Sequence, residues 1–154
     1  MNQDLYRLVY SSRNQIPGDD DACAREIRNI LKVARVNNLK AKITGALLFN
    51  AGSFGQVLEG PRGAIEATFE HIQCDPRHSD VALLGLDMVA NRVFENWSMA
   101  YTGADRIEGS RFGDIAVETD FDPTKMTADR ILQTLSRLTL EEEGNKAMVP
   151  PILS

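Results

Sequence analysis

Two amphipathic helix patterns that flank a β-hairpin pattern constrain the fold of this chain more than any other feature. The first helix is expected from about Ala22 to Asn37, where apolar residues follow i, i+3, i+4, i+7 spacing. The second is expected to begin at Pro61 and to end near Cys74–Asp75, before Pro76. Between them, "KITGALLFN" and "FGQVLEG" are joined by the turn "AGS". This order predicts that both helices cover one face of a mixed sheet.

Three further strand patterns complete the predicted sheet. The first strand is "LYRLVYSS" (Leu5–Ser12), and "SDVALLGLDMVA" carries the fourth. "FENWSMAYTG" carries the fifth, with Trp97, Met99 and Tyr101 on one face. The predicted fold is therefore α+β and ferredoxin-like, in the order β-α-β-β-α-β-β. An amphipathic helix from Met126 to Glu143 is expected to cover the other face.

Length and composition bound the remaining possibilities. The 154 residues suggest one folded unit at residues 1–105, with a C-terminal helical extension and tail at 106–154. The net charge of −5 disfavours sequence-independent nucleic-acid binding. No apolar run reaches membrane-spanning length, and the N-terminus lacks the pattern of a signal peptide. Cys23 and Cys74 form no CxxC pair. We expect a cytoplasmic protein that binds neither nucleic acid nor membrane.

A glutamine lies on a strand face that should be buried. Gln56 alternates with Phe54 and Leu58, and Tyr10 shares the matching face of the first strand with Leu8. If the helices cover this face, the Tyr10 hydroxyl and the Gln56 amide meet between sheet and helices. A buried amide must satisfy two donors and two acceptor lone pairs. The pair is either a satisfied core contact or part of a ligand site.

The ends of both helices carry other polar residues. Asn37 and Asn38 are expected at the C-terminal turn of the first helix, either as cap residues or as amides that reach the interior. The second helix places His71 and Asp75 on one side, and Arg77 and His78 follow. This group is either a solvated helix end or an anion-binding cluster.

Enzymatic and metal-dependent chemistry find little support in the sequence. Pro76 breaks the spacing that His71, Asp75 and His78 would need to bind one metal ion, so no metal site is expected. GxSxG, GxGxxG and Walker motifs are absent. We therefore expect no enzymatic activity.

Six segments together resemble the BLUF domain, a blue-light sensor that uses flavin. They are "LYRLVYSS", the "NN" near the end of the first helix, "ITGALLF", "GQVLEG", "CDPRHS" and "FENWSM", and they span roughly residues 5–102. The resemblance implies that residues 1–105 form a flavin-binding domain. It also implies a flavin ring between the two helices and the sheet. FAD is the expected cofactor, with FMN or riboflavin as alternatives.

The resemblance also implies roles for single residues. Tyr10 matches the photoactive tyrosine that gives an electron and a proton to the excited flavin, and Gln56 matches the glutamine that links this tyrosine to the ring. The other matched cofactor contacts are Asn37, Asn38, His71, Asp75, Arg77 and His78. Trp97 and Met99 match the residues that relay the signal. Two positions depart from the family pattern: Ala34 stands where some members have Ser or Thr, and His71 where others have Arg.

The function implied is light sensing. Proton-coupled electron transfer from Tyr10 would rearrange the hydrogen bonds of Gln56 and signal to an unidentified downstream protein or through a change of oligomeric state. We expect a homo-oligomer, a dimer or larger. Two alternatives stay open, a flavin-dependent enzyme and a cofactor-free ferredoxin-like interaction module.

Overall fold

The structure, a computed structural model, describes residues 4–50, 52–95, 97, 99–103 and 123–146. Five strands form one sheet in the order β4-β1-β3-β2-β5. The elements are β1 (Leu5–Asn14), α1 (Asp20–Ala41), β2 (Thr44–Asn50), β3 (Ser53–Pro61), α2 (Arg62–Gln73), β4 (His78–Met88), β5 (Ala100–Gly103), the 3-10 turn η1 (Pro123–Lys125) and α4 (Ala128–Lys146).

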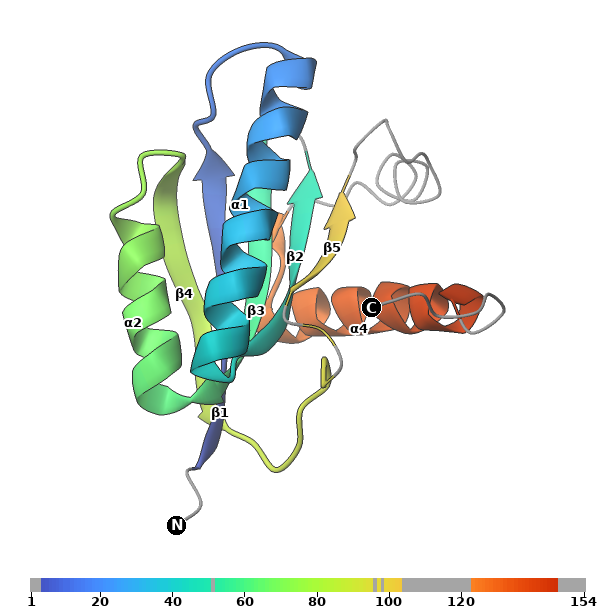
Figure 1. The fold of residues 1–154 in the computed structure, drawn as a ribbon. Helices are drawn as coiled ribbons and strands as arrows, with labels where there is room; N and C mark the ends of the chain where they lie inside the picture. Colours follow the sequence, from blue (N-terminus) through green and yellow to red (C-terminus); the bar gives the residue numbers. More distant parts are fainter. Residues whose placement is uncertain (1–3, 51, 96, 98, 104–122, 147–154) are drawn as a thin grey trace.

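The sheet is mixed, as predicted. β1 pairs antiparallel with both β3 and β4, β2 pairs antiparallel with β3, and β5 lies parallel to β2 at the edge. α1 and α2 lie over one face, and α4 lies across the other (Figure 1). The predicted α+β ferredoxin-like fold is confirmed. The proposed division at residue 105 falls outside the described residues.

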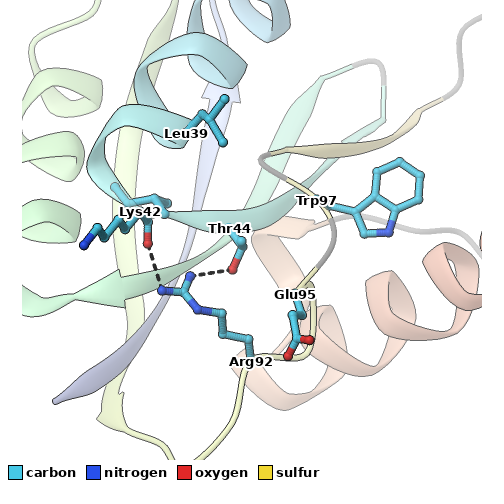
Figure 2. A pocket seen from close by; sticks show the side chains of 7 residues that line it. Leu39, Lys42, Thr44, Arg92, Glu95 and Trp97 are labelled. Carbon is cyan, nitrogen blue, oxygen red and sulfur yellow. Dashed lines mark hydrogen bonds between the residues drawn. The ribbon is translucent and has the colours of Figure 1, made fainter. Parts of the chain in front are cut away.

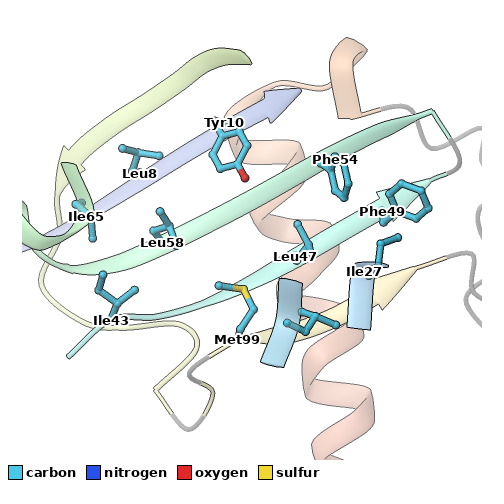
Figure 3. Close-up of a cluster of buried hydrophobic side chains, with 11 residues drawn as sticks. Leu8, Tyr10, Ile27, Ile43, Leu47, Phe49, Phe54, Leu58, Ile65 and Met99 are labelled. Atoms are coloured by element: carbon cyan, nitrogen blue, oxygen red, sulfur yellow. The ribbon is translucent and has the colours of Figure 1, made fainter. Parts of the chain in front are cut away.

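Two hydrophobic cores lie on the two faces of the sheet, because side chains alternate along each strand. The inner core fills the space between the sheet and α1 and α2, and Figure 3 shows its side chains. Its buried members are Leu8, Tyr10, Ile27, Leu31, Ile43, Leu47, Phe49, Phe54, Leu58, Ile65 and Met99. The outer core under α4 contains Val9, Ala46, Leu48, Val57, Phe94, Ile131, Leu135 and Leu138.

α1 is longer than the sequence pattern indicated. Asp19 caps its start by accepting a hydrogen bond from the Ala22 amide at 2.9 Å. It ends at Ala41, because Lys42 adopts left-handed backbone (φ 62°) and donates to the Asn38 and Leu39 carbonyls. Of the two alternatives for Asn37 and Asn38, the one that made them cap residues was therefore wrong. Both are inside the helix, and Lys42 is the cap.

The start of α2 also differs slightly from the prediction. Pro61 is the extended residue before the helix (φ −62°, ψ 140°), not its first helical residue. Pro61 is the last residue of β3 and Arg62 is the first of α2, so no loop separates the strand from the helix. This direct connection fixes α2 closely against the strand that carries Gln56.

The fifth strand is shorter than expected, and this changes the positions of Trp97 and Met99. β5 contains only Ala100–Gly103, and the chain before it turns, with the Trp97 amide donating to the Phe94 carbonyl at 3.0 Å. Met99 is buried in the inner core, whereas Trp97 packs against the outer core. The prediction that both share one strand face was wrong, because strand alternation does not apply to a turn. Tyr101, the third residue of that prediction, has a side chain that the structure does not describe.

Candidate functional site

Tyr10 and Gln56 form a buried hydrogen-bonded pair at the centre of the sheet. They lie directly opposite each other in the β1–β3 register. Their side chains are 1% and 7% exposed, and the Tyr10 hydroxyl donates to Gln56 Oε1. The contact expected from strand alternation is therefore present. The contact lies under α1 and α2, because these helices cover the sheet face on which both side chains project.

The surroundings keep the Tyr10 hydroxyl protonated. Burial raises the pKa of Tyr10 far above its usual range, and the negative charge of Asp75 raises it further. The ring packs against Phe69 at a centroid distance of 5.5 Å. Tyr10 is thus a neutral hydrogen-bond donor whose phenolate is strongly disfavoured in the folded protein.

Met99 completes the polar contacts of Gln56. The amide nitrogen Nε2 donates to Met99 Sδ at 3.3 Å, and the Met99 side chain is 1% exposed. Figure 3 places Met99 on the same side of the sheet as Tyr10 and Leu47. Gln56 therefore connects a phenol on β1 with a thioether just before β5. Met is a flexible and polarisable side chain.

The two adjacent asparagines of α1 differ in burial. Asn38 is 3% exposed, whereas the Asn37 side chain is exposed. Of the two predicted ring contacts, only Asn38 therefore supplies a buried amide. Adjacent helical positions are about 100° apart around the axis, so both cannot face the sheet.

An ion-pair cluster joins α1 to the loop before β4. Arg77 binds Asp75 through Nη2 at 2.7 Å and Glu26 through Nη1 at 2.7 Å. The Arg77 hydrogen bond holds the pKa of Asp75 below its usual range. The sequence interpretation had brought Asp75 and Arg77 together but missed Glu26. His71, predicted to flank them, is exposed on α2.

His78 lies beside the Tyr10 ring. Its Nδ1 is 2.8 Å from the Ser12 hydroxyl oxygen, and its ring packs 4.6 Å from Phe54 and 6.3 Å, edge-on, from Tyr10. Burial lowers the pKa of His78, although Asp75 partly opposes this shift. His78 thus presents a neutral imidazole to the inner core near neutral pH.

Sequence reasoning missed Glu59, a wholly buried carboxylate on the outer face of β3. It binds Arg7 at 3.1 Å and accepts from the Val93 and Phe94 amides at 2.8 and 3.0 Å. Glu59 therefore holds the segment that leads to Trp97. The signal was available, because alternation places Glu59 on the same strand face as Val57, and a charge there is as unusual as Gln56 on the other face.

The described residues carry neither a metal-binding cluster nor a membrane-spanning helix. Within the described ranges, no cluster of three or more His, Cys, Asp or Glu side chains is arranged to bind a metal ion. None of the helices in the described part of the chain has both the length and the apolarity of a membrane-spanning segment.

The donor set fits a flavin ring better than a sugar or a free anion. An isoalloxazine is a large apolar ring with one polar edge of alternating donors and acceptors. The site offers apolar inner-core side chains beside the Gln56 and Asn38 amides and the Tyr10 phenol. Amides match such an edge because each supplies both donors and acceptors.

Comparisons with known proteins agree with this geometry. The family model described as "Sensors of blue-light using FAD" matches residues 5–100. The blue light- and temperature-regulated antirepressor BluF of Escherichia coli (strain K12) is 33% identical over 90 residues, which cover 58% of this chain and 21% of that protein. The chain therefore spans about a fifth of the length of this curated relative.

Two solved structures are similar over most of the chain. The dark-state structure of BlrB, a BLUF protein, has a TM-score of 0.73 and 28% sequence identity, covering 92% of this chain and 99% of that one. The photo-activated state of BlsA has a TM-score of 0.71 and 29% identity, covering 87% and 94%.

Proposed function

The chain belongs to the BLUF family of blue-light sensors that use FAD, and we propose that it senses light through a flavin bound beside Tyr10 and Gln56. The observation that carries this proposal is the buried Tyr10–Gln56–Met99 chain of contacts. It joins a redox-capable phenol to an amide with two hydrogen-bonding patterns.

The residues that would hold the flavin come from three elements. The amides of Gln56 on β3 and Asn38 on α1, with the phenol of Tyr10 on β1, are proposed for the ring. Asp75, Arg77 and His78 are proposed for the ribityl side. A bound flavin supplies absorption of blue light and an acceptor for one electron and one proton. FAD is the proposed form, with FMN or riboflavin as the alternatives.

Tyr10 is the proposed donor of that electron and proton. Its raised pKa keeps the proton on the hydroxyl in the dark. Its hydrogen bond to Gln56 Oε1 would place the Gln56 amide between the departing proton and the flavin that accepts it. Loss of an electron makes a phenol far more acidic, so electron and proton leave together when an acceptor is already in place. The Tyr10–Gln56 contact would thus prepare Tyr10 for coupled transfer.

Gln56 is the proposed switch. In the structure its oxygen accepts from Tyr10 and its nitrogen donates to Met99. Rotation of the amide, or its conversion to the imidic tautomer, would exchange these roles. Each hydrogen bond is worth on the order of 1 kcal/mol, and an unsatisfied partner costs about 1–3 kcal/mol. Such a difference shifts a two-state equilibrium by about tenfold.

The output is proposed to be a protein partner or a change of oligomeric state. Met99 lies directly before β5, so repacking of its side chain would alter the edge of the sheet beside β2. We propose a sensor without catalytic activity, because Tyr10 and Gln56 are hydrogen-bonded to each other and Arg77 is held by Glu26 and Asp75. A flavin-dependent enzyme would need a further acid–base pair at this site.

A spectroscopic experiment tests the proposal. The purified full chain is reconstituted with FAD in the dark, and absorption spectra are recorded before and after blue light. We expect a reversible shift of the flavin bands to longer wavelength without bleaching. Bound flavin that shows no such shift would contradict the sensor proposal. Protein that retains no flavin after refolding with FAD, FMN or riboflavin would favour the cofactor-free module.

A further inference from the structure

The second half of α1 carries an unusual concentration of positive charge. Between Arg28 and Lys42 the sequence has cations and no carboxylate, in a chain of net charge −5. Their side chains are exposed, and none forms an ion pair with a described residue. They are Arg28, Lys32, Arg35, Lys40 and Lys42. Such a patch attracts an acidic surface and accelerates its association.

Apolar side chains lie among these cations. Val33, Val36 and Leu39 on α1 are 59%, 51% and 74% exposed. A helix that packs its apolar stripe on a sheet normally presents polar residues outward. Three large apolar side chains at a spacing of three residues therefore form a second apolar stripe, which is exposed in the described part of the chain. We call this stripe with the five cations the α1 outer face.

A pocket of about 500 Å³ lies at the C-terminal end of the α1 outer face. Figure 2 shows Leu39 from α1, Arg92 from the segment after β4, and Trp97 around it. Arg92 bridges the Lys42 carbonyl and the Thr44 hydroxyl, each at 2.9 Å. Leu39, Ile43 and Trp97 give the pocket an apolar wall of a size that fits one large side chain.

The α1 outer face is connected to Gln56 through Met99. Arg35 Nε donates to the Met99 carbonyl at 2.9 Å, and Met99 Sδ accepts from Gln56 Nε2 at 3.3 Å. Trp97 of the pocket lies two residues before Met99, and its carbonyl accepts from the Gly45 amide at 3.1 Å. A rearrangement of Gln56 would therefore act through Met99 on Arg35 of the α1 outer face and on Trp97 of the pocket.

We propose that the α1 outer face and its pocket bind an acidic amphipathic helix of a partner protein, with one large apolar side chain inserted between Leu39 and Trp97. The proposal rests on the proposed light-sensing function and names the chemistry of its partner. An alternating arrangement of cations and apolar side chains matches a helix with acidic flanks and an apolar ridge. Glu95 in the pocket disfavours a uniform polyanion such as duplex DNA or an anionic bilayer.

Binding of defined probes to the flavin-loaded full chain tests the proposal. The first probe is a fluorescein-labelled synthetic helix with Glu beside a Leu ridge, and its control has Lys in place of Glu. Duplex DNA and phosphatidylglycerol vesicles are the competing probes. We expect the acidic helix to bind at least about tenfold more tightly than its Lys counterpart at low salt, and added salt to weaken it.

Matched variants locate the binding surface. The double change Lys32→Glu and Lys40→Glu should raise the Kd at least about tenfold, whereas Arg130→Glu with Arg137→Glu on α4 changes net charge equally and should raise it less than about twofold. Both Arg130 and Arg137 are exposed. Leu39→Ser should weaken binding, and Leu83→Ser, at a site 50% exposed on β4, should not.

The possible results separate this proposal from the light-sensing function. Equal affinity for both helices, or equal loss in the α1 and α4 double variants, would overturn it. Binding of DNA or vesicles that depends on Lys32 and Lys40, without binding of the acidic helix, would overturn it too. Blue light should change the Kd at least about threefold, because Met99 joins the surface to Gln56. A protein that shows the spectral shift with an unchanged Kd contradicts the coupling, and one without the shift contradicts the sensor function.

Discussion

Tyr10 on β1 and Gln56 on the neighbouring strand β3 are register partners whose side chains lie on the same face of the sheet. The phenol donates to the amide oxygen within a core closed by α1 and α2. A strand pair supplies this contact because directly opposed residues in an antiparallel register have neighbouring Cβ atoms. The two residues need no loop to bring them together. The contact is therefore as rigid as the sheet, and its hydrogen-bond pattern is the part that can change.

Replacing Tyr10 with Phe should leave flavin bound but abolish the red-shifted state, because it removes the proposed donor of the electron and proton. The free energy of unfolding should fall by about 1–2 kcal/mol, because Gln56 Oε1 loses its hydrogen-bond donor. Difference absorption spectroscopy and urea denaturation measure the two effects. Tyr6→Phe is the matched control on the same strand face and should keep the shift. A normal photocycle in Tyr10→Phe would refute the donor role.

Replacing Gln56 with Leu should also abolish the red shift, although Tyr10 remains. Leu has similar size but cannot exchange hydrogen-bond roles between Tyr10 and Met99. The flavin spectrum of the variant, recorded before and during illumination, provides the measurement. Gln73→Leu, at an exposed position at the end of α2, should behave like the parent protein. Persistence of the shift in Gln56→Leu would place the switch elsewhere.

Glu59 should contribute strongly to stability. Glu59→Ala leaves Arg7 without its partner and the Val93 and Phe94 amides without their acceptor, so unfolding should become easier by about 3–5 kcal/mol. Urea denaturation measures this cost, with emission of Trp97, the single tryptophan, as the local reporter. Glu66→Ala removes an exposed pair with Arg62 and should leave the free energy of unfolding nearly unchanged. Similar losses in both variants would contradict the anchoring role of Glu59.

Stability should fall between pH 7.5 and 5.5 because of His78. Its pKa is lowered in the folded state, so between the folded value and the ordinary value of about 6.5 the unfolded chain binds more protons. The free energy of unfolding therefore decreases as the pH falls through this window. The pKa of Asp75 is also lowered, but its contribution is lost only at more acidic pH.

Urea midpoints at the two pH values measure this effect. His78→Gln should flatten the dependence, and the change at the other histidine, His71→Gln, should preserve it because that side chain is exposed. A dependence that is unchanged in His78→Gln would assign the titration to another group.

Glu26 should influence which flavin binds. Glu26 and Asp75 both form ion pairs with Arg77. A phosphate near this guanidinium would therefore be repelled by two carboxylates. Glu26→Gln removes one negative charge and should raise the affinity for FMN relative to riboflavin by several-fold. Titration of apoprotein with each flavin, followed by fluorescence quenching, measures the ratio. Glu70→Gln on the exposed surface of α2 is the control. An unchanged ratio in Glu26→Gln would show that the phosphate does not approach Arg77.

The central site could be predicted from the sequence because it follows from regular alternation. Gln56 alternates with Phe54 and Leu58, Tyr10 shares its strand face with Leu8, and the two flanking helices identify the covered face. Trp97 could not be placed in this way. Its segment makes a turn held by the buried Glu59 carboxylate, and no local pattern indicates that a side chain from another strand will bind those amides.

The sequence by itself determined the order of the elements, the faces of β1 and β3 that the two helices cover, and the polar pair on those faces. These depend on periodicities of 2 and 3.6 residues, which are local properties of the chain. Only the tertiary structure decided that Asn38 and not Asn37 is buried, that Trp97 and Met99 belong to different cores, and that Glu26 closes on Arg77. Each of these depends on contacts between residues distant in sequence, where packing and charge pairing overrule the local pattern.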